Sequence, residues 1–257
     1  CDILIIDHHT ITNDMNSRTV VHYNPRFDKK SLYQSATYCA YKICSEIEDT
    51  SGRLWIAAVG MVSDYNLEDS QDIVAEVVKR YSVDKILYNS VFGRIADMLA
   101  YTRSTGMLTC EEMVELLCNA GTLENLENTR NYDKLLQSYQ IIDTEINELV
   151  DDAEKNAERV GNVIFYNIKS RYGLSSIVST RLSERYKNKI VIIYERNKPG
   201  AKLSARNQSR NFDVGKLLQR AMHGIHGAAG GHEAAAGATM PAKDWEKFRE
   251  QLVALAG

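Results

Sequence analysis

The chain has 257 residues, of which 44% are hydrophobic and 25% are charged, and its formal net charge is -3. This is the composition of a globular protein with room for one large domain or two smaller ones. The slight negative charge excludes a protein that coats nucleic acid non-specifically, because such binding needs a large excess of Lys and Arg.

The cysteines and the hydropathy pattern indicate a cytoplasmic location. The five cysteines are an odd number without CxxC spacing, which does not fit a disulfide framework. The sequence has no apolar run of about 18 residues and no signal-peptide pattern at its start, so it predicts neither membrane insertion nor secretion. Because Cys1 opens directly onto an apolar segment, we expect an upstream segment to precede the numbered residues.

Residues 3–6 are all apolar and are followed by Asp7, His8 and His9. A short apolar run that ends in polar residues is typical of a parallel strand buried on both faces. Ligands of open α/β sheets bind outside the carboxyl ends of the strands. We therefore expect these three polar side chains at the functional edge of a sheet.

The rest of the N-terminal half is predicted to be mainly helical. Residues 18–23 are a second short strand, and residues 32–47 form a helix with one apolar face. Residues 54–62 are so apolar that a buried helix is favoured over a strand, although periodicity alone does not separate the two. The pattern from 70 to 120 is helical, with a helix start at Thr109.

A three-four spacing of apolar residues predicts one long helix from 135 to 160, with a narrow apolar seam. This helix is long enough to connect two domains. Beyond it, strands at 163–168 and 190–194 flank a helix at 175–186, which is a βαβ-like arrangement.

The C-terminal part continues with short elements. Residues 203–206 are predicted as a strand and residues 214–222 as a helix. Residues 224–237 are predicted as a glycine-alanine-rich loop that runs into a helix, and residues 242–255 as the last helix. Alternating strands and helices of this kind predict an α/β protein.

The Asp7-His8-His9 triplet suits metal-assisted phosphate chemistry. One imidazole can bind a divalent ion while the other contacts phosphate, and Asp7 can accept a ring proton and so orient a histidine. The alternative is a strand end with surface histidines. Asp64 ends the apolar segment 54–62, as a carboxylate ligand held on a rigid element does. Taken alone, Asp64 indicates only an acid at a helix end.

Two C-terminal segments are candidates for substrate binding. In Gly230-Gly231-His232 the glycines let backbone N–H groups approach a phosphate, and His232 adds a donor. Ser204 and Arg206 lie two positions apart on a predicted strand, so both point the same way and both can bind phosphate. The alternatives are a packing device for the glycines and a solvated strand edge for Ser204 and Arg206.

The C-terminal half is locally basic. A groove for nucleic acid needs such a cluster, although a charge cluster is also common on a solvated face. The basic residues are Lys187, Lys189, Arg196, Lys198, Lys202, Arg206 and Arg210.

In order and approximate spacing, these motifs resemble the DHH phosphoesterases that carry a C-terminal DHHA1 domain. The resemblance implies a DHH catalytic domain with a parallel sheet, incomplete at its N-terminus, at residues 1–128. It further implies a connecting helix at 129–160 and a smaller α/β DHHA1 substrate-binding domain at 161–257. The motifs that carry the resemblance are Asp7-His8-His9, Asn24-Pro25, Asp64, Ser204-Ala205-Arg206 and Gly230-Gly231-His232.

The resemblance also implies a two-metal site, usually of Mn2+ with Mg2+ as an alternative, in which a bridging hydroxide attacks phosphorus. His8 and Asp64 are then ligands of one ion. His9 contacts the substrate phosphate, and Asp7 supports the histidines as a further catalytic residue.

The substrate-binding residues implied by the resemblance lie in the DHHA1 part. They hold the nucleotide and are Ser204, Arg206, Gly230, Gly231 and His232. The family's first two motifs do not occur in the numbered sequence. We therefore expect these residues alone to bind Mn2+ weakly and to hydrolyse nothing.

Residues 172–178, followed by Arg181 and Leu182, are similar to the RecJ-type exonucleases and their archaeal relatives. This implies a nuclease acting on single-stranded DNA or RNA or on short oligonucleotides. One alternative is a phosphodiesterase or phosphatase for nano-oligonucleotides, cyclic dinucleotides or phosphoadenosine phosphate. A second is a non-catalytic scaffold in a replication complex, and a replication or repair protein is a further possible partner.

Overall fold

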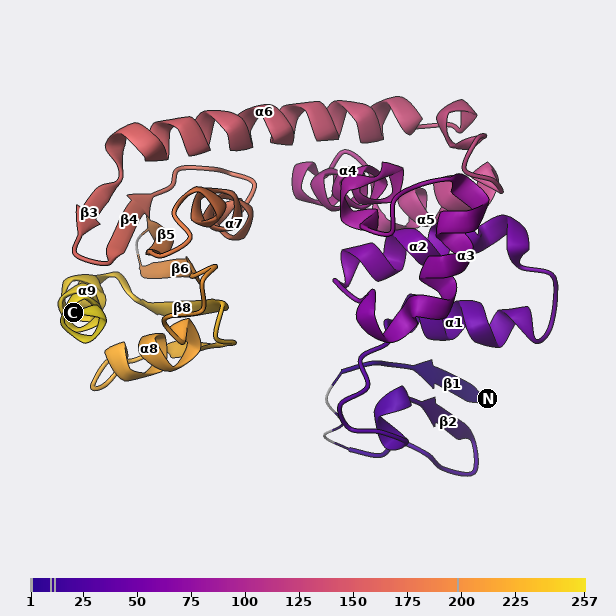
Figure 1. Cartoon of the computed structure of the whole chain (residues 1–257), viewed down its shortest axis with the longest axis horizontal. Helices are drawn as coiled ribbons and strands as arrows, with labels where there is room; N and C mark the ends of the chain where they lie inside the picture. The colour runs from indigo at the N-terminus through magenta and orange to yellow at the C-terminus, as the bar shows by residue number, and fades with distance from the viewer. Residues whose placement is uncertain (1, 10, 12, 198) are drawn as a thin grey trace. The chain divides into compact units, whose positions relative to one another are not determined.

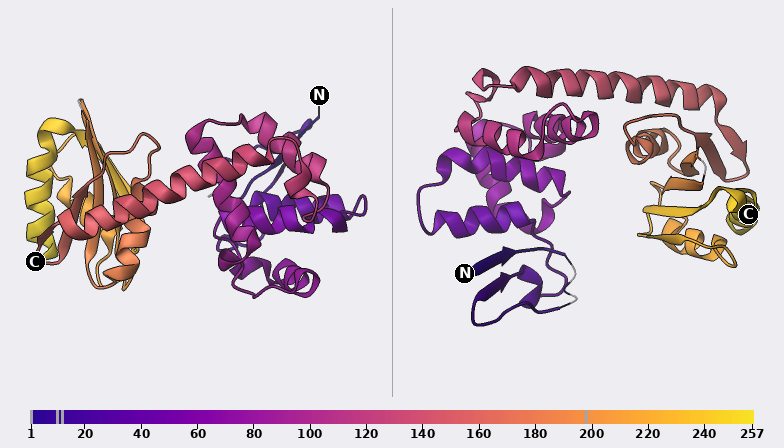
Figure 2. Two further views of the ribbon diagram at one scale, coloured as in Figure 1. Left: turned by 90° about the horizontal axis from the view of Figure 1, so that it is seen from above. Right: turned by 180° about the vertical axis from the view of Figure 1, so that it is seen from behind.

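The computed structural model describes residues 2–9, 11, 13–197 and 199–257 (Figures 1 and 2). The chain divides into two compact units, Cys1–Gln140 and Ile141–Gly257, and the division falls within the long helix α6 (Tyr132–Asn156). Cys1 and Lys198, which entered the sequence analysis, lie outside the described residues. Among the described helices, none is both long and apolar enough to cross a lipid bilayer.

The first unit contains a two-stranded parallel sheet formed by β1 (Ile3–Ile6) and β2 (Val20–Tyr23). Both strands and their parallel pairing agree with the sequence prediction. The predicted burial of both faces of the first strand is wrong, because Ile3 and Leu4 are 51% and 54% exposed. Within the described residues β1 pairs with β2 alone, and a sheet of two strands leaves much of its surface uncovered.

Helices form the rest of this unit. Their order is α1 (Ala36–Ser45), α2 (Leu54–Ser63), α3 (Gln71–Tyr81), α4 (Val91–Thr105) and α5 (Cys110–Ala120). The predicted buried helix is confirmed, since seven of the ten residues of α2 are buried and the helix packs on α1, α3 and α4. Helix α1 begins later than predicted, because the Ser35 side chain accepts a hydrogen bond from the Tyr38 N–H and caps the helix there.

The predicted helix start at Thr109 is confirmed, because Thr109 is the N-cap of α5 and forms a capping box with Glu112. The Thr109 hydroxyl accepts from the Glu112 N–H at 3.2 Å, and the Glu112 carboxylate accepts from the Thr109 N–H at 2.8 Å. Thr109→Ala is expected to lower the free energy of unfolding by about 1 kcal/mol, because one N–H of the first turn loses its acceptor. Urea denaturation measures the change.

Ser104→Ala is the matched control for this prediction. Ser104 is an exposed residue inside α4 whose hydroxyl donates only to the Ala100 carbonyl. Its replacement should alter the free energy of unfolding by less than about 0.5 kcal/mol. Equal effects of the Thr109 and Ser104 replacements would show that the capping box adds no stability.

The second unit contains a six-stranded mixed sheet in the order β3-β4-β5-β6-β8-β7. Strands β4 and β5 are parallel and are connected through α7 (Ser175–Arg185), which confirms the predicted βαβ unit. Helix α6 ends at Asn156, so Val160 belongs to a strand and not to the long helix that the sequence predicts. The strands are β3 (Glu158–Val160), β4 (Val163–Asn167), β5 (Ile190–Asn197), β6 (Gly200–Arg206), β7 (Ala228–Gly231) and β8 (Ala235–Pro241).

Helices cover both faces of this sheet (Figure 1). Helix α7 packs on β5 and β6, and α8 (Val214–Ala221) and α9 (Trp245–Ala256) cover the opposite face. Fully buried Phe248 and Leu252 of α9 belong to the core on that face. The α/β fold class predicted for this part is thereby confirmed.

The predicted glycine-alanine loop at 224–237 that runs into a helix is wrong. These residues form the hairpin β7-β8, and β8 pairs with β6 along its length. Small residues are needed because α8 packs closely on β7: a Cβ added to Gly215 would lie 3.0 Å from the Gly231 carbonyl oxygen. The small side chains reflect close packing of a helix on strands, which composition alone does not distinguish from a loop.

Candidate metal and phosphate sites

Asp7, His8 and His9 directly follow β1 at the carboxyl end of the parallel pair. The Asp7 N–H donates to the Tyr23 carbonyl at 3.0 Å, so the pairing with β2 continues up to the triplet. One ligand atom from each residue lies within 4.8 Å of the other two. The triplet can therefore present three donor atoms to one cation.

Asp64 lies beside the triplet although it is far away in the sequence. Its Oδ2 is 4.0 Å from His8 Nε2, and it is the C-cap residue of the buried helix α2. Two donors that are each about 2.1 Å from an ion lie about 3 Å apart in adjacent coordination positions and about 4 Å apart in opposite ones. The two side chains therefore fit a divalent ion between them.

A backbone N–H and the side chain of Arg26 hold His8 in this orientation. The Ala36 N–H, in the first turn of α1, donates to His8 Nδ1 at 3.2 Å, and Arg26 Nε donates to the His8 carbonyl at 2.9 Å. With Nδ1 as an acceptor, the proton of a neutral ring is on Nε2. An ion bound at Nε2 would need the ring proton to be on Nδ1, and the hydrogen bond from the Ala36 N–H would then be lost.

His9 is oriented by Asp7. The distance from His9 Nδ1 to Asp7 Oδ1 is 2.7 Å, and this hydrogen bond is the main reason that the pKa of Asp7 is lowered to about 2. The ionised carboxylate can only accept, so His9 Nδ1 carries a proton. The His9 ring is 78% exposed and stacks on His8 at 4.4 Å. Its Nε2 is thus free to bind an ion or, when protonated, to donate to a phosphate.

Two residues outside the predicted set support this site. Asn24 is buried and its amide donates to Asp7 Oδ2 at 3.3 Å and to the His9 carbonyl at 3.1 Å. The Tyr33 hydroxyl donates to the Asp64 carbonyl at 3.0 Å, and its ring meets His8 edge-on at 5.6 Å. The Asn24-Pro25 pair was a signal for the first residue, but the sequence contained no signal for Tyr33.

In the second unit, Ser204 and Arg206 lie on one face of β6, as the alternation of the strand predicts, and this face packs on α7. Arg206 Nη2 donates to Ser176 Oγ at 2.9 Å, and Nε donates to Thr180 Oγ1 at 3.1 Å. Ser204 Oγ is 2.9 Å from Ser179 Oγ. A phosphate must therefore join or displace these two hydroxyl partners of Arg206. Sequence reasoning missed both partners, although their spacing of four residues on α7 was a usable signal.

Two glycines lie in line with Ser204 on the neighbouring strands of the sheet. Ser204 pairs with Gly237 of β8, which pairs with Gly230 of β7, so all three lie on the same face. A Cβ added to Gly230 would meet no atom within 4 Å. We call Gly230 and Gly237 the glycine shelf; it leaves backbone accessible beside Ser204. His232 is exposed in the turn that follows β7, and its N–H donates to the Ala235 carbonyl at 2.8 Å.

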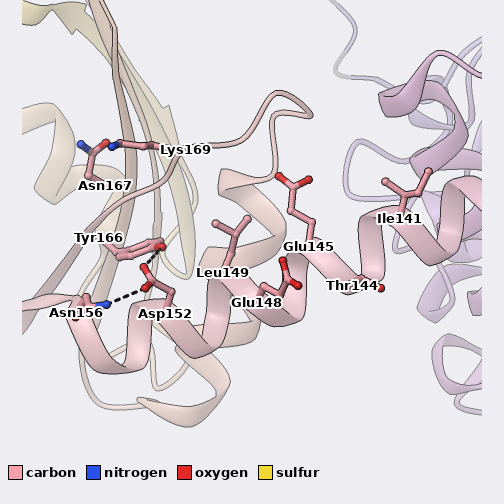
Figure 3. A pocket seen from close by; sticks show the side chains of 10 residues that line it. All are labelled: Ile141, Thr144, Glu145, Glu148, Leu149, Asp152, Asn156, Tyr166, Asn167 and Lys169. Carbon is pink, nitrogen blue, oxygen red and sulfur yellow. Dashed lines mark hydrogen bonds between the residues drawn. The ribbon is translucent and has the colours of Figure 1, made fainter.

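A pocket of about 840 Å³ elsewhere in this unit contains none of the predicted substrate-binding residues. Figure 3 shows Asp152 of α6 accepting hydrogen bonds from the Tyr166 hydroxyl, at 2.6 Å, and from Asn156. Three carboxylates against one lysine make the pocket unfavourable for phosphate. It is lined by Ile141, Thr144, Glu145, Glu148, Leu149, Asp152, Asn156, Tyr166, Asn167 and Lys169.

Comparison with known proteins identifies the second unit. The family model of the DHHA1 domain matches residues 160–256. The sequence has no match among curated proteins.

Solved structures with the same fold cover nearly the whole chain. RecJ in complex with Mn2+ from Thermus thermophilus has a TM-score of 0.70 and 19% identity, with 99% of this chain and 41% of that chain covered. An exonuclease RecJ bound to manganese has a TM-score of 0.59 and 18% identity, with 99% and 69% covered. The pGpG-specific phosphodiesterase PggH from Vibrio cholerae has a TM-score of 0.55 and 12% identity, with 94% and 81% covered.

The chain spans less than half the length of the Thermus RecJ, and identities this low establish a common fold and nothing further. The fold and the family model together confirm the resemblance on which the sequence analysis relied. Residues 160–256 match the family model of the DHHA1 domain, and the chain as a whole has the fold of the RecJ structures.

Proposed function

We propose that the intact protein is a metal-dependent phosphoesterase that hydrolyses single-stranded nucleic acid. The observation that carries this proposal is the approach of His8 Nε2 to Asp64 Oδ2 at 4.0 Å, at the carboxyl end of two parallel strands. Mn2+ is the proposed ion and Mg2+ the alternative, and Thermus RecJ structures with each of these ions support the choice.

The ions supply a hydroxide nucleophile and stabilise charge on the phosphate. The residues of this chain would bind and orient. His8 and Asp64 hold one ion, and Asp64 is fixed as the C-cap residue of α2, a helix that is mostly buried. Asp7 fixes the ring of His9 through Nδ1, which leaves Nε2 to contact a phosphate oxygen.

Substrate binding is assigned to the DHHA1 domain as part of the same proposal. Arg206 would bind a phosphate through its guanidinium, with Ser204 beside it. Gly230, Gly231 and His232 would contribute backbone and imidazole donors, since the glycine shelf lets a phosphate approach the strands closely. The division into residues 1–128, 129–160 and 161–257 is proposed with it.

A second candidate is a phosphodiesterase for small nucleotides. The structural similarity to PggH, a pGpG-specific phosphodiesterase, favours it, because most of both chains is covered. Arg206 and the glycine shelf can hold a single phosphate whatever the length of the strand attached to it. The metal site would be the same in both cases, and only the substrate that reaches it would differ.

The test is hydrolysis by the intact protein in Mn2+, with EDTA as the control, of a single-stranded 30-mer, a linear dinucleotide and a cyclic dinucleotide. Progressive shortening of the 30-mer is the expected result, because the basic residues near the C-terminus attract the strand backbone. Cleavage of the dinucleotides alone would select the second candidate. An intact protein that binds Mn2+ and cleaves none of the three would contradict both and favour a scaffold.

A further inference from the structure

An exposed pair of tyrosines lies next to the candidate metal site. The rings of Tyr65 and Tyr88 stack with their centroids 5.5 Å apart, and the side chains are 79% and 37% exposed. Neither ring belongs to the hydrophobic core of this unit. Ile86, two residues before Tyr88, is 53% exposed and adds to this apolar surface.

The backbone of Tyr65 has a conformation that suits glycine. Helix α2 ends in a Schellman motif, in which the Tyr65 N–H donates to the Val62 carbonyl and the Asn66 N–H donates to the Met61 carbonyl. Tyr65 therefore has a φ of 51°, in the left-handed region. At the end of α4 the corresponding left-handed position is occupied by Gly106. Tyr65 therefore occupies a backbone position that glycine would adopt without strain.

Several contacts place Tyr65 beside the candidate metal site. It directly follows Asp64, and consecutive Cα atoms are about 3.8 Å apart. The Tyr33 hydroxyl donates to the Asp64 carbonyl, and the Tyr33 ring meets His8. The buried Asn66 amide donates to the Tyr33 carbonyl and holds this segment from the other side.

The charges around the pair suit a neutral ligand. Burial is the main cause of the raised pKa of Tyr88, and the negative charge of Glu68 raises it further. The Tyr88 phenol is therefore neutral at pH 7. The Glu68 carboxylate would repel a phosphate, but it does not oppose a flat uncharged ring.

We propose that Tyr65 and Tyr88 form a stacking platform for a nucleobase next to the phosphate held at His8 and Asp64. Every nucleobase has an aromatic face, so such a platform binds single-stranded nucleic acid with little sequence preference. This inference rests on the proposed function. It specifies how the base beside the scissile bond is bound.

The test compares the binding of two single strands to the intact protein in Mn2+ by fluorescence anisotropy. One is oligothymidine with hydrolysis-resistant phosphorothioate linkages, and the other is the same backbone with abasic sites. Tyr65→Gly is expected to weaken binding of oligothymidine about tenfold. Binding of the abasic strand should not change, because it has no base to stack. Tyr65→Phe should stay within about twofold of the unaltered protein.

Stability separates a binding role from a structural one. Tyr65→Gly removes the strain of the left-handed residue, so its melting temperature should stay within about 3 °C of the unaltered protein. Ile47→Ala is the control for loss of an exposed apolar side chain, since Ile47 is 80% exposed on another part of the unit. This variant should bind both strands normally.

Three results would overturn the platform. The first is equal affinity of Tyr65→Gly and the unaltered protein for oligothymidine, and the second is an equal loss for the abasic strand. The third is a change of oligomeric state in Tyr65→Gly with unchanged base affinity, which would make the surface an interface between copies. Failure of the proposed function is distinguishable, because it shows as absent hydrolysis of unmodified DNA and not as a change in binding of the uncleavable strands.

Discussion

Replacing Asp64 with asparagine is expected to weaken Mn2+ binding by about 100-fold and to lower kcat/KM on a single strand by about 1000-fold. The amide keeps the size of the side chain but removes the negative charge that faces His8 Nε2 at 4.0 Å. Supporting partners of metal ligands alone are worth about 10- to 100-fold in affinity, and ions contribute several kcal/mol to transition-state stabilisation. Titration calorimetry with Mn2+ and a hydrolysis assay measure the two quantities.

Two control variants show whether the effect is specific to this position. Asp28→Asn removes an exposed carboxylate, and His226→Ala removes an exposed imidazole from the other unit. Both should bind Mn2+ like the unaltered protein. His8→Ala should match Asp64→Asn in its loss of affinity, because the two side chains are assigned to the same ion. Normal Mn2+ binding by both His8→Ala and Asp64→Asn would place the ion elsewhere.

The separate parts of the metal site were predictable from the sequence, but their contact was not. A strand that ends in Asp7-His8-His9 and an apolar helix that ends at Asp64 are local patterns, and the structure contains both. That they meet depends on the packing of α1 against both β1 and α2, which involves residues far apart along the chain. Before the structure, only the resemblance to DHH proteins connected His8 with Asp64.

The two wrong predictions about strands share a physical cause. An apolar run indicates a buried strand only if neighbouring elements cover it, and the first two residues of β1 are exposed. A glycine-alanine segment indicates a loop only if nothing pairs with it, and β8 pairs with β6 from Gly200 to Arg206. In both cases non-local pairing decides the outcome, and strand propensity depends strongly on such context.

The surroundings of Arg206 illustrate a different limit. The alternation of β6 correctly predicts that Ser204 and Arg206 face the same way. It does not predict that α7 covers that face with the hydroxyls of Ser176 and Thr180, which accept hydrogen bonds from the guanidinium. The strand pattern therefore predicts which residues face the site. It does not predict the hydrogen-bond partners that Arg206 has on α7 when no substrate is bound.

Replacement by alanine is expected to destabilise the fold at Gly231 but not at Gly230, although the two glycines are adjacent in β7. Gly231 has a φ of 147°, and a Cβ there would lie 2.4 Å from the Ala235 carbonyl oxygen and 2.5 Å from Ala236 Cα. These atoms belong to the backbone of the paired strand, so the hairpin must distort. Gly231→Ala is therefore expected to lower the free energy of unfolding by about 3 kcal/mol, measured by urea denaturation.

Gly230→Ala is the matched variant, because its Cβ would meet no atom within 4 Å. Its free energy of unfolding should change by less than about 0.5 kcal/mol. Its affinity for a single-stranded oligonucleotide should nevertheless fall about tenfold, since the new methyl group occupies space through which a phosphate reaches the backbone, at the loss of about one hydrogen bond. Normal affinity in a stably folded Gly230→Ala protein would mean that the glycines serve only the packing of the hairpin. Loss of affinity without loss of stability would separate the role of Gly230 in substrate binding from the role of Gly231 in folding.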